Sequence, residues 1–296
     1  MTTAGEIRDG LYCLDPKDEQ KYNKNQKLMK IPYRLGAYKD IFDSRDYQVK
    51  NVLRYKYATA NSIDYTKLMS SVKNQGNLGS CVAFAIAAVV EYQQQLQYLK
   101  SLERGSSYKR DKKHYNLSEQ WIYWNTKEID QWGKYDEGTS IRDGLKIINT
   151  KGVPQERGWP YKDINEEYGQ PKFWAHSTAN WNRSESYHRI NGLDELKESL
   201  IEIGPVVAGV FVFYEFFFPN NGVISYPIDT NRFYGGHAIA IVGFDDTTKL
   251  VKFKNSWGSN WGKNGYGYLP YRYIQDFMMD CWVTTNYENI KSLSKI

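Results

Sequence analysis

Long apolar runs are missing from this sequence of 296 residues. No stretch of about 18 consecutive apolar residues occurs, which excludes an ordinary transmembrane helix. The first thirty residues alternate charged and polar groups and contain no apolar core of the kind that a secretory signal requires. The sequence therefore predicts a cytoplasmic protein that does not associate with membranes.

Cysteine is also scarce, with only Cys13, Cys81 and Cys281. An odd number does not fit a fully paired disulfide framework, and three isolated positions do not fit a zinc site with paired spacing. We expect Cys13 and Cys281 to be small buried apolar side chains. The low count favours a reducing compartment. No metal or organic cofactor is expected.

Charge of one sign is not concentrated either. The chain has 39 Lys and Arg against 34 Asp and Glu, a net charge of +5. A nucleic-acid-binding protein usually carries a basic face, so nucleic acid is not expected as a partner. The composition, 41% hydrophobic and 25% charged, is that of a globular protein. The length suffices for two lobes that share an interface.

The chain divides into three parts by pattern. Residues 1–61 are rich in turn signals and weakly patterned, which indicates an extension that wraps a domain. Residues 62–165 are mainly helical, and the run Cys81–Tyr92 is apolar nearly all round, so we expect a buried central helix there. Residues 166–296 contain short β-prone segments separated by turns, namely 206–213, 237–244, 251–254, 266–269 and 282–285. This order predicts an α+β fold with a cleft between a helical and an antiparallel β lobe.

The start of the predicted central helix has the chemistry of a nucleophile. Cys81 follows a polar loop that contains Gly76, Gly79 and Ser80. The N–H groups at a helix N-terminus, and a neighbouring imidazolium, lower a thiol pKa and favour the reactive thiolate. Cys81 is therefore the candidate nucleophile.

A base and its orienting group are found in the β-prone half. Among four histidines, only His237 follows a Gly-Gly pair and begins an apolar strand; His114, His176 and His188 lack this frame. Asn255 ends the strand that follows. If the two strands pair around Asp245-Asp246, the two side chains meet at one end of the sheet, where the Asn amide can orient the imidazole. Trp257, just beyond, could shield that bond from water.

The loop before Cys81 supplies a candidate oxyanion hole. The side-chain amide of Gln75 and the backbone N–H of Cys81 are donors that can face the charge developing on a tetrahedral intermediate. Taken alone, Gln75 would be ordinary loop polarity.

These residues lie in three blocks that resemble the active-site blocks of papain-like cysteine peptidases, in the same order. The blocks are Gln75-Gly-x-x-Gly-Ser-Cys81, Gly236-His237-Ala238, and Asn255-Ser-Trp-Gly followed by Trp261-Gly-x-x-Gly-Tyr-Gly267. The resemblance covers roughly residues 62–286. It implies a two-lobe fold with a β-barrel C-terminal lobe, and an endopeptidase that cleaves polypeptides through a thioester on Cys81.

The resemblance also implies sites along the substrate. Gly138 is expected to follow the substrate backbone, and Gly236 and Trp257 to line its binding site. Leu78 and Val82 stand where secreted relatives carry a disulfide cysteine and a tryptophan. These departures are similar to those of the intracellular bacterial, phage and large-virus branch, so a virion is a second expected location.

Several alternatives stay open at this stage. Residues 1–61 are either a pro-segment that occupies the cleft or a permanent structural extension. The rival functions are a catalytically silent papain-like binding or virion component, and a related acyl transfer such as isopeptidase, deubiquitinating, amidase or transglutaminase activity. The intact quartet Gln75, Cys81, His237 and Asn255 favours a peptidase over a silent protein.

Overall fold

The structure is a computed structural model that describes residues 33–53, 60–103, 116–130, 138–163 and 169–285. It also gives the backbone of two short paired strands, β1 (Ile7–Arg8) and β2 (Leu11–Tyr12). Cys13 and His114 lie outside the described residues, as does most of the predicted extension before residue 33.

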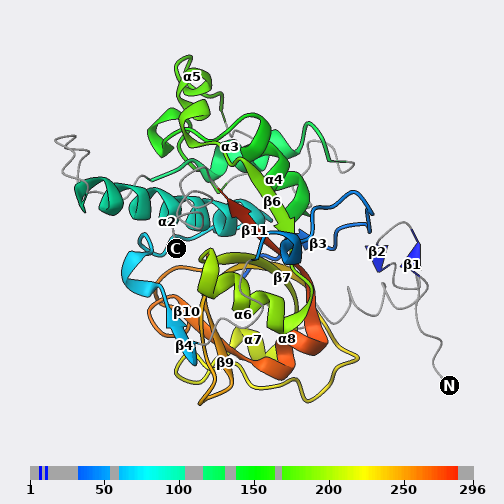
Figure 1. Ribbon diagram of the computed structural model, residues 1–296. Helices are drawn as coiled ribbons and strands as arrows, with labels where there is room; N and C mark the ends of the chain where they lie inside the picture. Colours follow the sequence, from blue (N-terminus) through cyan, green and yellow to red (C-terminus); the bar gives the residue numbers. More distant parts are fainter. Residues whose placement is uncertain are drawn as a thin grey trace.

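The first lobe is helical, as predicted. Helix α2 (Cys81–Glu103) crosses the middle of the molecule, and α3 (Glu119–Thr126), α4 (Ile141–Thr150) and the short α5 (Ala175–Ala179) lie above it in Figure 1. Ser118 caps α3 by accepting the N–H of Trp121, and Ser140 caps α4 by accepting the N–H of Asp143. Each Ser side chain satisfies an N–H that the first helical turn leaves unpaired.

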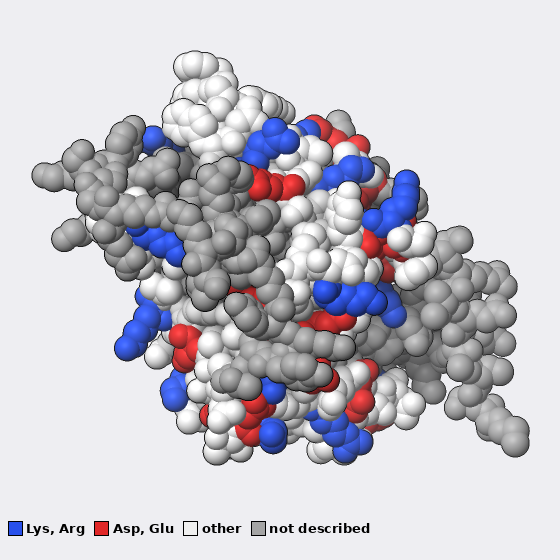
Figure 2. All heavy atoms as spheres, in the orientation of Figure 1, with Lys and Arg blue, Asp and Glu red and all other residues white. Residues whose placement is uncertain are grey.

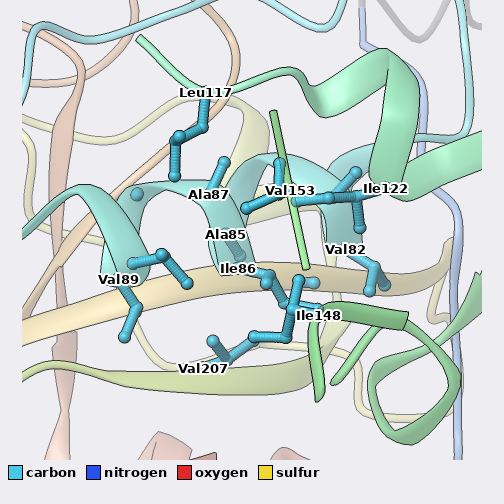
Figure 3. Close-up of a cluster of buried hydrophobic side chains, with 14 of the residues drawn as sticks. Val82, Ala85, Ile86, Ala87, Val89, Leu117, Ile122, Ile148, Val153 and Val207 are labelled. Carbon is cyan, nitrogen blue, oxygen red and sulfur yellow. The ribbon is translucent and has the colours of Figure 1, made fainter. Parts of the chain in front are cut away.

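The all-round apolarity of α2 is explained by its position between the lobes. Residues 81–94 are buried on every side. Figure 3 shows α2 side chains packed against the other helices and the sheet; it labels Val82, Ala85, Ile86, Ala87, Val89, Leu117, Ile122, Ile148, Val153 and Val207. Each fully buried Val or Ile contributes roughly 1.5–3 kcal/mol, so this packing holds the start of α2 in place.

The second lobe is an antiparallel sheet. Its strands run in the order β10-β9-β8-β7-β11-β6, and β4 pairs with β8. The bounds are β4 (Ser62–Asp64), β6 (Ser186–Arg189), β7 (Val206–Val212), β8 (Gly235–Asp245), β9 (Leu250–Lys254), β10 (Tyr266–Pro270) and β11 (Met278–Thr285). Three helices pack on it, α6 (Gly192–Glu202), α7 (Tyr214–Phe217) and α8 (Tyr271–Phe277). The predicted α+β arrangement of a helical and a β lobe is confirmed (Figure 1).

The apolar core consists of two clusters. One joins α2, α3 and α4 with residues of β7, β8 and β11, and the other joins the sheet with α6, α7 and α8. Ala175 and Ala179 of α5 pack in the helical cluster. This cluster therefore also draws on residues beyond 165, and the division of the chain at residue 166 stays a prediction.

Residues 33–53 run across both lobes. Their strand β3 (Ala37–Tyr38) pairs in parallel with β5 (Thr139–Ser140), and Val49, in the 3-10 turn Val49–Asn51, is fully buried in the β-lobe core. We call residues 33–38 the cleft segment, because they lie between the loop before α2 and the start of β8. Its contacts are described with the site.

A group of charged side chains holds residues 39–53 in place. We call it the anchor cluster; its members are Asp40, Asp46, Arg142, Arg189 and Asp280. The Asp40 carboxylate accepts hydrogen bonds from the Trp282 indole at 2.9 Å and the Arg142 backbone N–H at 3.2 Å. Asp46 accepts from Arg142 of α4 at 2.6 Å and from Arg189 of β6 at 3.0 Å. The anchor cluster thus ties residues 39–53 to both lobes.

The surface seen in Figure 2 carries blue and red side chains interspersed, without a field of one sign. Within the described ranges, no helix combines the length and apolarity needed to cross a membrane.

Candidate active site

Cys81 is the first residue of α2 and is fully buried. The loop that leads to it is held from two sides. The Gln75 N–H donates to the Ser256 carbonyl at 2.8 Å, and the Tyr161 hydroxyl donates to the Gln75 carbonyl at 2.6 Å. The same hydroxyl lies 2.6 Å from Ser80 Oγ. The loop therefore enters the helix in one fixed path, which places the thiol at the helix N-terminus.

His237 and Asn255 meet as the hairpin predicts. Strands β8 and β9 pair antiparallel, and His237 Nε2 lies 2.7 Å from Asn255 Oδ1. Cys81 Sγ accepts the N–H of Ala238, the next residue, at 3.4 Å, so the thiol lies against the start of β8. The other ring nitrogen, Nδ1, has no hydrogen-bond partner among the described residues. The arrangement leaves one imidazole nitrogen oriented by an amide and the other available for a proton.

Trp257 covers the imidazole. Its ring centroid lies 4.5 Å from that of His237, and Phe216 stands edge-on to His237 at 5.9 Å. Both aromatic side chains are buried. Excluding water strengthens the His237–Asn255 bond, because the effective dielectric around it falls. Phe216 belongs to the aromatic run 214–218, of which Phe216 and Phe217 are buried while Tyr214 and Phe218 are exposed.

The cleft segment covers this site. The Tyr33 ring stacks on Trp257 with centroids 4.4 Å apart and planes at 4°. The N–H of Gly36 donates to the Gly236 carbonyl at 3.2 Å. The carbonyl of Gly36 accepts the N–H of Thr139 at 2.9 Å. Polypeptide backbone thus already fills the place where the sequence predicts substrate.

The two glycines predicted to line the substrate both touch the cleft segment. A Cβ on Gly138 would lie 2.3 Å from the Gly36 carbonyl oxygen, and a Cβ on Gly236 would lie 2.1 Å from that of Ala37. Because real Cβ atoms do not approach oxygen so closely, only glycine permits a backbone to lie here. Gly138 also has a φ of +90°, a conformation that other residues rarely adopt.

The side chain of Gln75 reaches the same backbone. Its Nε2 donates to the Arg34 carbonyl at 3.1 Å and to the Leu78 carbonyl at 2.8 Å, while its Oε1 accepts from Ser256 Oγ at 2.6 Å. The amide is thereby held with its donor toward a carbonyl oxygen in the cleft. An oxyanion hole needs that orientation.

Burial opposes ionisation of Cys81 and His237. It raises the pKa of the Cys81 thiol to about 12, although backbone N–H groups, among them those of Ala238, Val82 and Gly36, act in the opposite direction. Burial lowers the pKa of His237 to about 4, against the bond from Asn255. The sequence predicted a lowered thiol pKa from the helix N-terminus. With the cleft filled, desolvation outweighs that effect, and both groups are neutral near pH 7.

We expect the thiol of the intact chain to react accordingly. With a pKa of about 12, the thiolate fraction is small at pH 7 and rises about tenfold for each pH unit. The alkylation rate of Cys81 by iodoacetamide should therefore climb from pH 6 to pH 10 without a plateau. Mass spectrometry of peptides, which separates Cys81 from Cys13 and Cys281, measures it. A plateau below pH 8 would show an ionised thiol in the closed state.

One polar group near the site was not found from the sequence. Lys254, which precedes Asn255, is buried, and its ammonium donates to Ser70 Oγ at 2.8 Å. Burial lowers the pKa of Lys254 to about 8. Ser70 in turn bonds Glu91 of α2, and Glu91 accepts from Lys73 at 2.7 Å. The only sign of this buried group in the sequence was a lysine at the end of the apolar strand that leads to Asn255.

No group of three or more His, Cys, Asp or Glu side chains in the described ranges is arranged to hold a metal ion. Leu78 and Val82, the two departures noted in the sequence, are buried in the helical core. Cys281 is buried in β11, as predicted.

Similarity to known proteins agrees with this geometry. The model of the papain family cysteine proteases matches residues 59–286. A peptidase C1-like protein of Acanthamoeba polyphaga mimivirus is 31% identical over 224 residues, which cover 71% of this chain and 68% of that protein. The viral cathepsin of Spodoptera litura multicapsid nucleopolyhedrovirus is 26% identical over 258 residues, covering 83% of this chain and 70% of that protein.

A solved structure is similar over most of both chains. Xylellain, a cysteine protease from Xylella fastidiosa, superposes with a TM-score of 0.72 at 29% identity, covering 86% of this chain and 97% of its own. Two further relatives, from Dictyostelium discoideum and mouse, are matched over only 41% and 56% of their length. The viral and bacterial relatives confirm the predicted resemblance to those branches. The chain belongs to the papain family of cysteine proteases.

Proposed function

We propose that the chain is a cysteine endopeptidase that hydrolyses polypeptides through a thioester on Cys81. The observation that carries the proposal is the contact of three groups from separate parts of the chain. Cys81 Sγ lies against the start of β8, and His237 on that strand is held by Asn255 at 2.7 Å. A nucleophile, a base and an orienting group in reach of one another are what acyl transfer requires.

In the proposed reaction, the thiol of Cys81 gives its proton to His237 and attacks the scissile carbonyl carbon. The oxyanion accepts hydrogen bonds from the Gln75 side chain and the Cys81 N–H. His237 then protonates the leaving amine, which departs as the carbon–nitrogen bond breaks. Water, deprotonated by His237, attacks the thioester and releases the acid. Asn255 keeps the imidazole ring in place through both steps.

We further propose that the cleft segment keeps the enzyme latent. Two observations support this. The segment bridges the two lobes at the site, because the Gly36 N–H donates to the Gly236 carbonyl at 3.2 Å and the Gly36 carbonyl accepts the Thr139 N–H at 2.9 Å. The segment also keeps Cys81 and His237 buried, which favours their neutral forms. Opening the cleft would return water to both groups and favour the thiolate–imidazolium pair.

Two fates of residues 1–61 fit this proposal. The region is either removed as a pro-segment or retained as an extension that moves aside. The anchor cluster supports retention, since it ties Asp40 and Asp46 to both lobes. Mass spectrometry of the purified chain over days decides between them. Under retention we expect no cut before Ser62; a cut that occurs there and is absent from the Cys81→Ala variant would instead identify a pro-segment.

The rival functions are separated by reactivity. A catalytically silent binding protein would neither cleave a diverse peptide library nor be labelled at Cys81 by an epoxide inhibitor of thiol peptidases. An isopeptidase would cleave branched substrates and leave linear peptides intact. We expect linear peptides to be cleaved. The proposed site of action is the cytoplasm or a virus particle, and the relatives from viruses are compatible with the latter.

A further inference from the structure

One peptide unit of the helical lobe binds the backbone of the cleft segment. The N–H of Thr139 donates to the Gly36 carbonyl at 2.9 Å, next to the pairing of Ala37 with Thr139. The Gly138 carbonyl and the Thr139 N–H belong to the same peptide plane. Because that plane is rigid and trans, its C=O and N–H point in opposite directions. Whatever fixes the Gly138 carbonyl therefore aims the Thr139 N–H.

The group that fixes the Gly138 carbonyl is the ammonium of Lys127. Lys127 follows α3, and its Nζ donates to the Gly138 carbonyl oxygen. The same Nζ lies 3.0 Å from Asp130 Oδ2 and 5.2 Å from the centroid of the Tyr123 ring. The side chains of Lys127 and Asp130 are 2% and 1% exposed, so this ammonium is withdrawn from water. A charge-assisted bond to a carbonyl in such surroundings is strong.

The other end of the pairing edge is held independently. Ser140 Oγ donates to Asp143 Oδ2 at 3.0 Å and accepts the Asp143 N–H at 3.2 Å, which ties β5 to the start of α4. Strand β5 has only two residues, and Gly138 before it has a φ of +90°. Without a further contact, the first peptide plane of this short strand could rotate, because a glycine precedes it. Lys127 removes that freedom.

We propose that Lys127 is a positioning residue for polypeptide binding in the cleft. Its ammonium orients the Gly138–Thr139 peptide plane so that the Thr139 N–H receives a carbonyl of the bound chain. The occupant is the cleft segment in the closed state and, resting on the proposed peptidase function, a substrate in the open state. Lys127 touches neither Cys81 nor His237 in this arrangement, and its role is in binding extended backbone.

Substrates of two lengths test this role. Loosening the cleft segment acts on both substrates alike, so the ratio of their kcat/KM values is the readout. In the Lys127→Met variant, kcat/KM for an extended peptide should fall about 3- to 10-fold relative to kcat/KM for the ester of a single blocked amino acid, the effect of one lost hydrogen bond. The ester does not reach the edge and so reports only how far the cleft is open. An unchanged ratio would overturn the proposal.

A matched control is available on the same lobe. Lys151 bonds the Asn125 side-chain oxygen at 2.6 Å and is 38% exposed, away from the cleft. Lys151→Met should behave as the wild type. Since Lys127→Met leaves Asp130 without its ammonium, a double variant with Asp130→Asn removes both charges. It should show the same dependence on substrate length if the single variant folds poorly.

Hydrogen–deuterium exchange separates this proposal from the peptidase proposal. In the Lys127→Met variant, the amides of Gly36 to Tyr38 and of Thr139 should exchange at least about threefold faster than in the wild type and in Lys151→Met. This readout needs no catalysis. If neither the wild type nor a chain opened by Gly36→Val hydrolyses either substrate, the peptidase proposal fails while exchange still decides the role of Lys127. Unchanged exchange at these amides would contradict it.

Discussion

Replacing Cys81 by alanine is expected to lower kcat/KM for peptide hydrolysis by about four to six orders of magnitude, the loss typical of removing a covalent nucleophile. The substitution removes only the sulfur from a fully buried position at the start of α2. His237 and Asn255 keep their hydrogen bond, but no acyl-enzyme can form. Initial rates on the best substrate of a peptide library, with reductant present, measure the change.

The matched control is Cys281→Ala. Cys281 is also fully buried, in β11, and makes no contact with the proposed reacting groups. Its replacement should cost stability without removing activity, which separates loss of the nucleophile from loss of packing. A Cys81→Ala variant that retains its full rate would assign the hydrolysis to another residue or to a contaminant.

The second large effect is expected at Gly36. A Cβ at this position would lie 2.1 Å from the carbonyl oxygen of Gly79, a backbone atom that cannot move aside cheaply. Valine at position 36 should therefore expel the cleft segment and leave the lobes folded around their own cores. We expect the initial peptidase rate of Gly36→Val to exceed that of the wild type at least about tenfold, because each 1.4 kcal/mol of lost inhibition is a factor of ten.

The control for this experiment is Lys39→Val. It introduces the same side chain three positions along at an exposed residue, and it should leave the enzyme latent. Cys81 alkylation in Gly36→Val should also reach a plateau at lower pH than in the wild type, since water returns to the thiol. If Gly36→Val is no more active, and its Cys81 is as unreactive as before, the cleft segment is not the inhibitor.

The residues of the candidate site were accessible from sequence because their placement depends on local rules. An apolar run after a Gly-Ser loop predicts that Cys81 starts a buried helix, and α2 does start there. Two strands joined by a turn at Asp245-Asp246 predict that His237 and Asn255 share one end of a hairpin. The 2.7 Å bond between them agrees with that prediction. Periodicity and turn chemistry are encoded within a few residues, so one sequence suffices.

Whether the cleft is filled depends on contacts between residues far apart in the chain, and such contacts leave no local pattern in the sequence. Gly36 and Asp40 lie in weakly patterned sequence, yet Gly36 meets Gly79 and Gly138, and the Asp40 N–H bonds Asp280, 240 positions away. The thiol pKa was likewise beyond local reasoning, because the helix N-terminus favours ionisation and the filled cleft opposes it.

The sequence by itself thus determined the fold class, the family resemblance and the catalytic candidates of this chain. Only the tertiary structure decided that residues 33–38 lie over Cys81, and that Lys127 holds the edge to which they bind. The physical reason is that an irregular segment takes its conformation from distant partners. Hydrogen bonds to the carbonyls of these partners, interactions with their charges and the exclusion of water take effect only once the two lobes have packed.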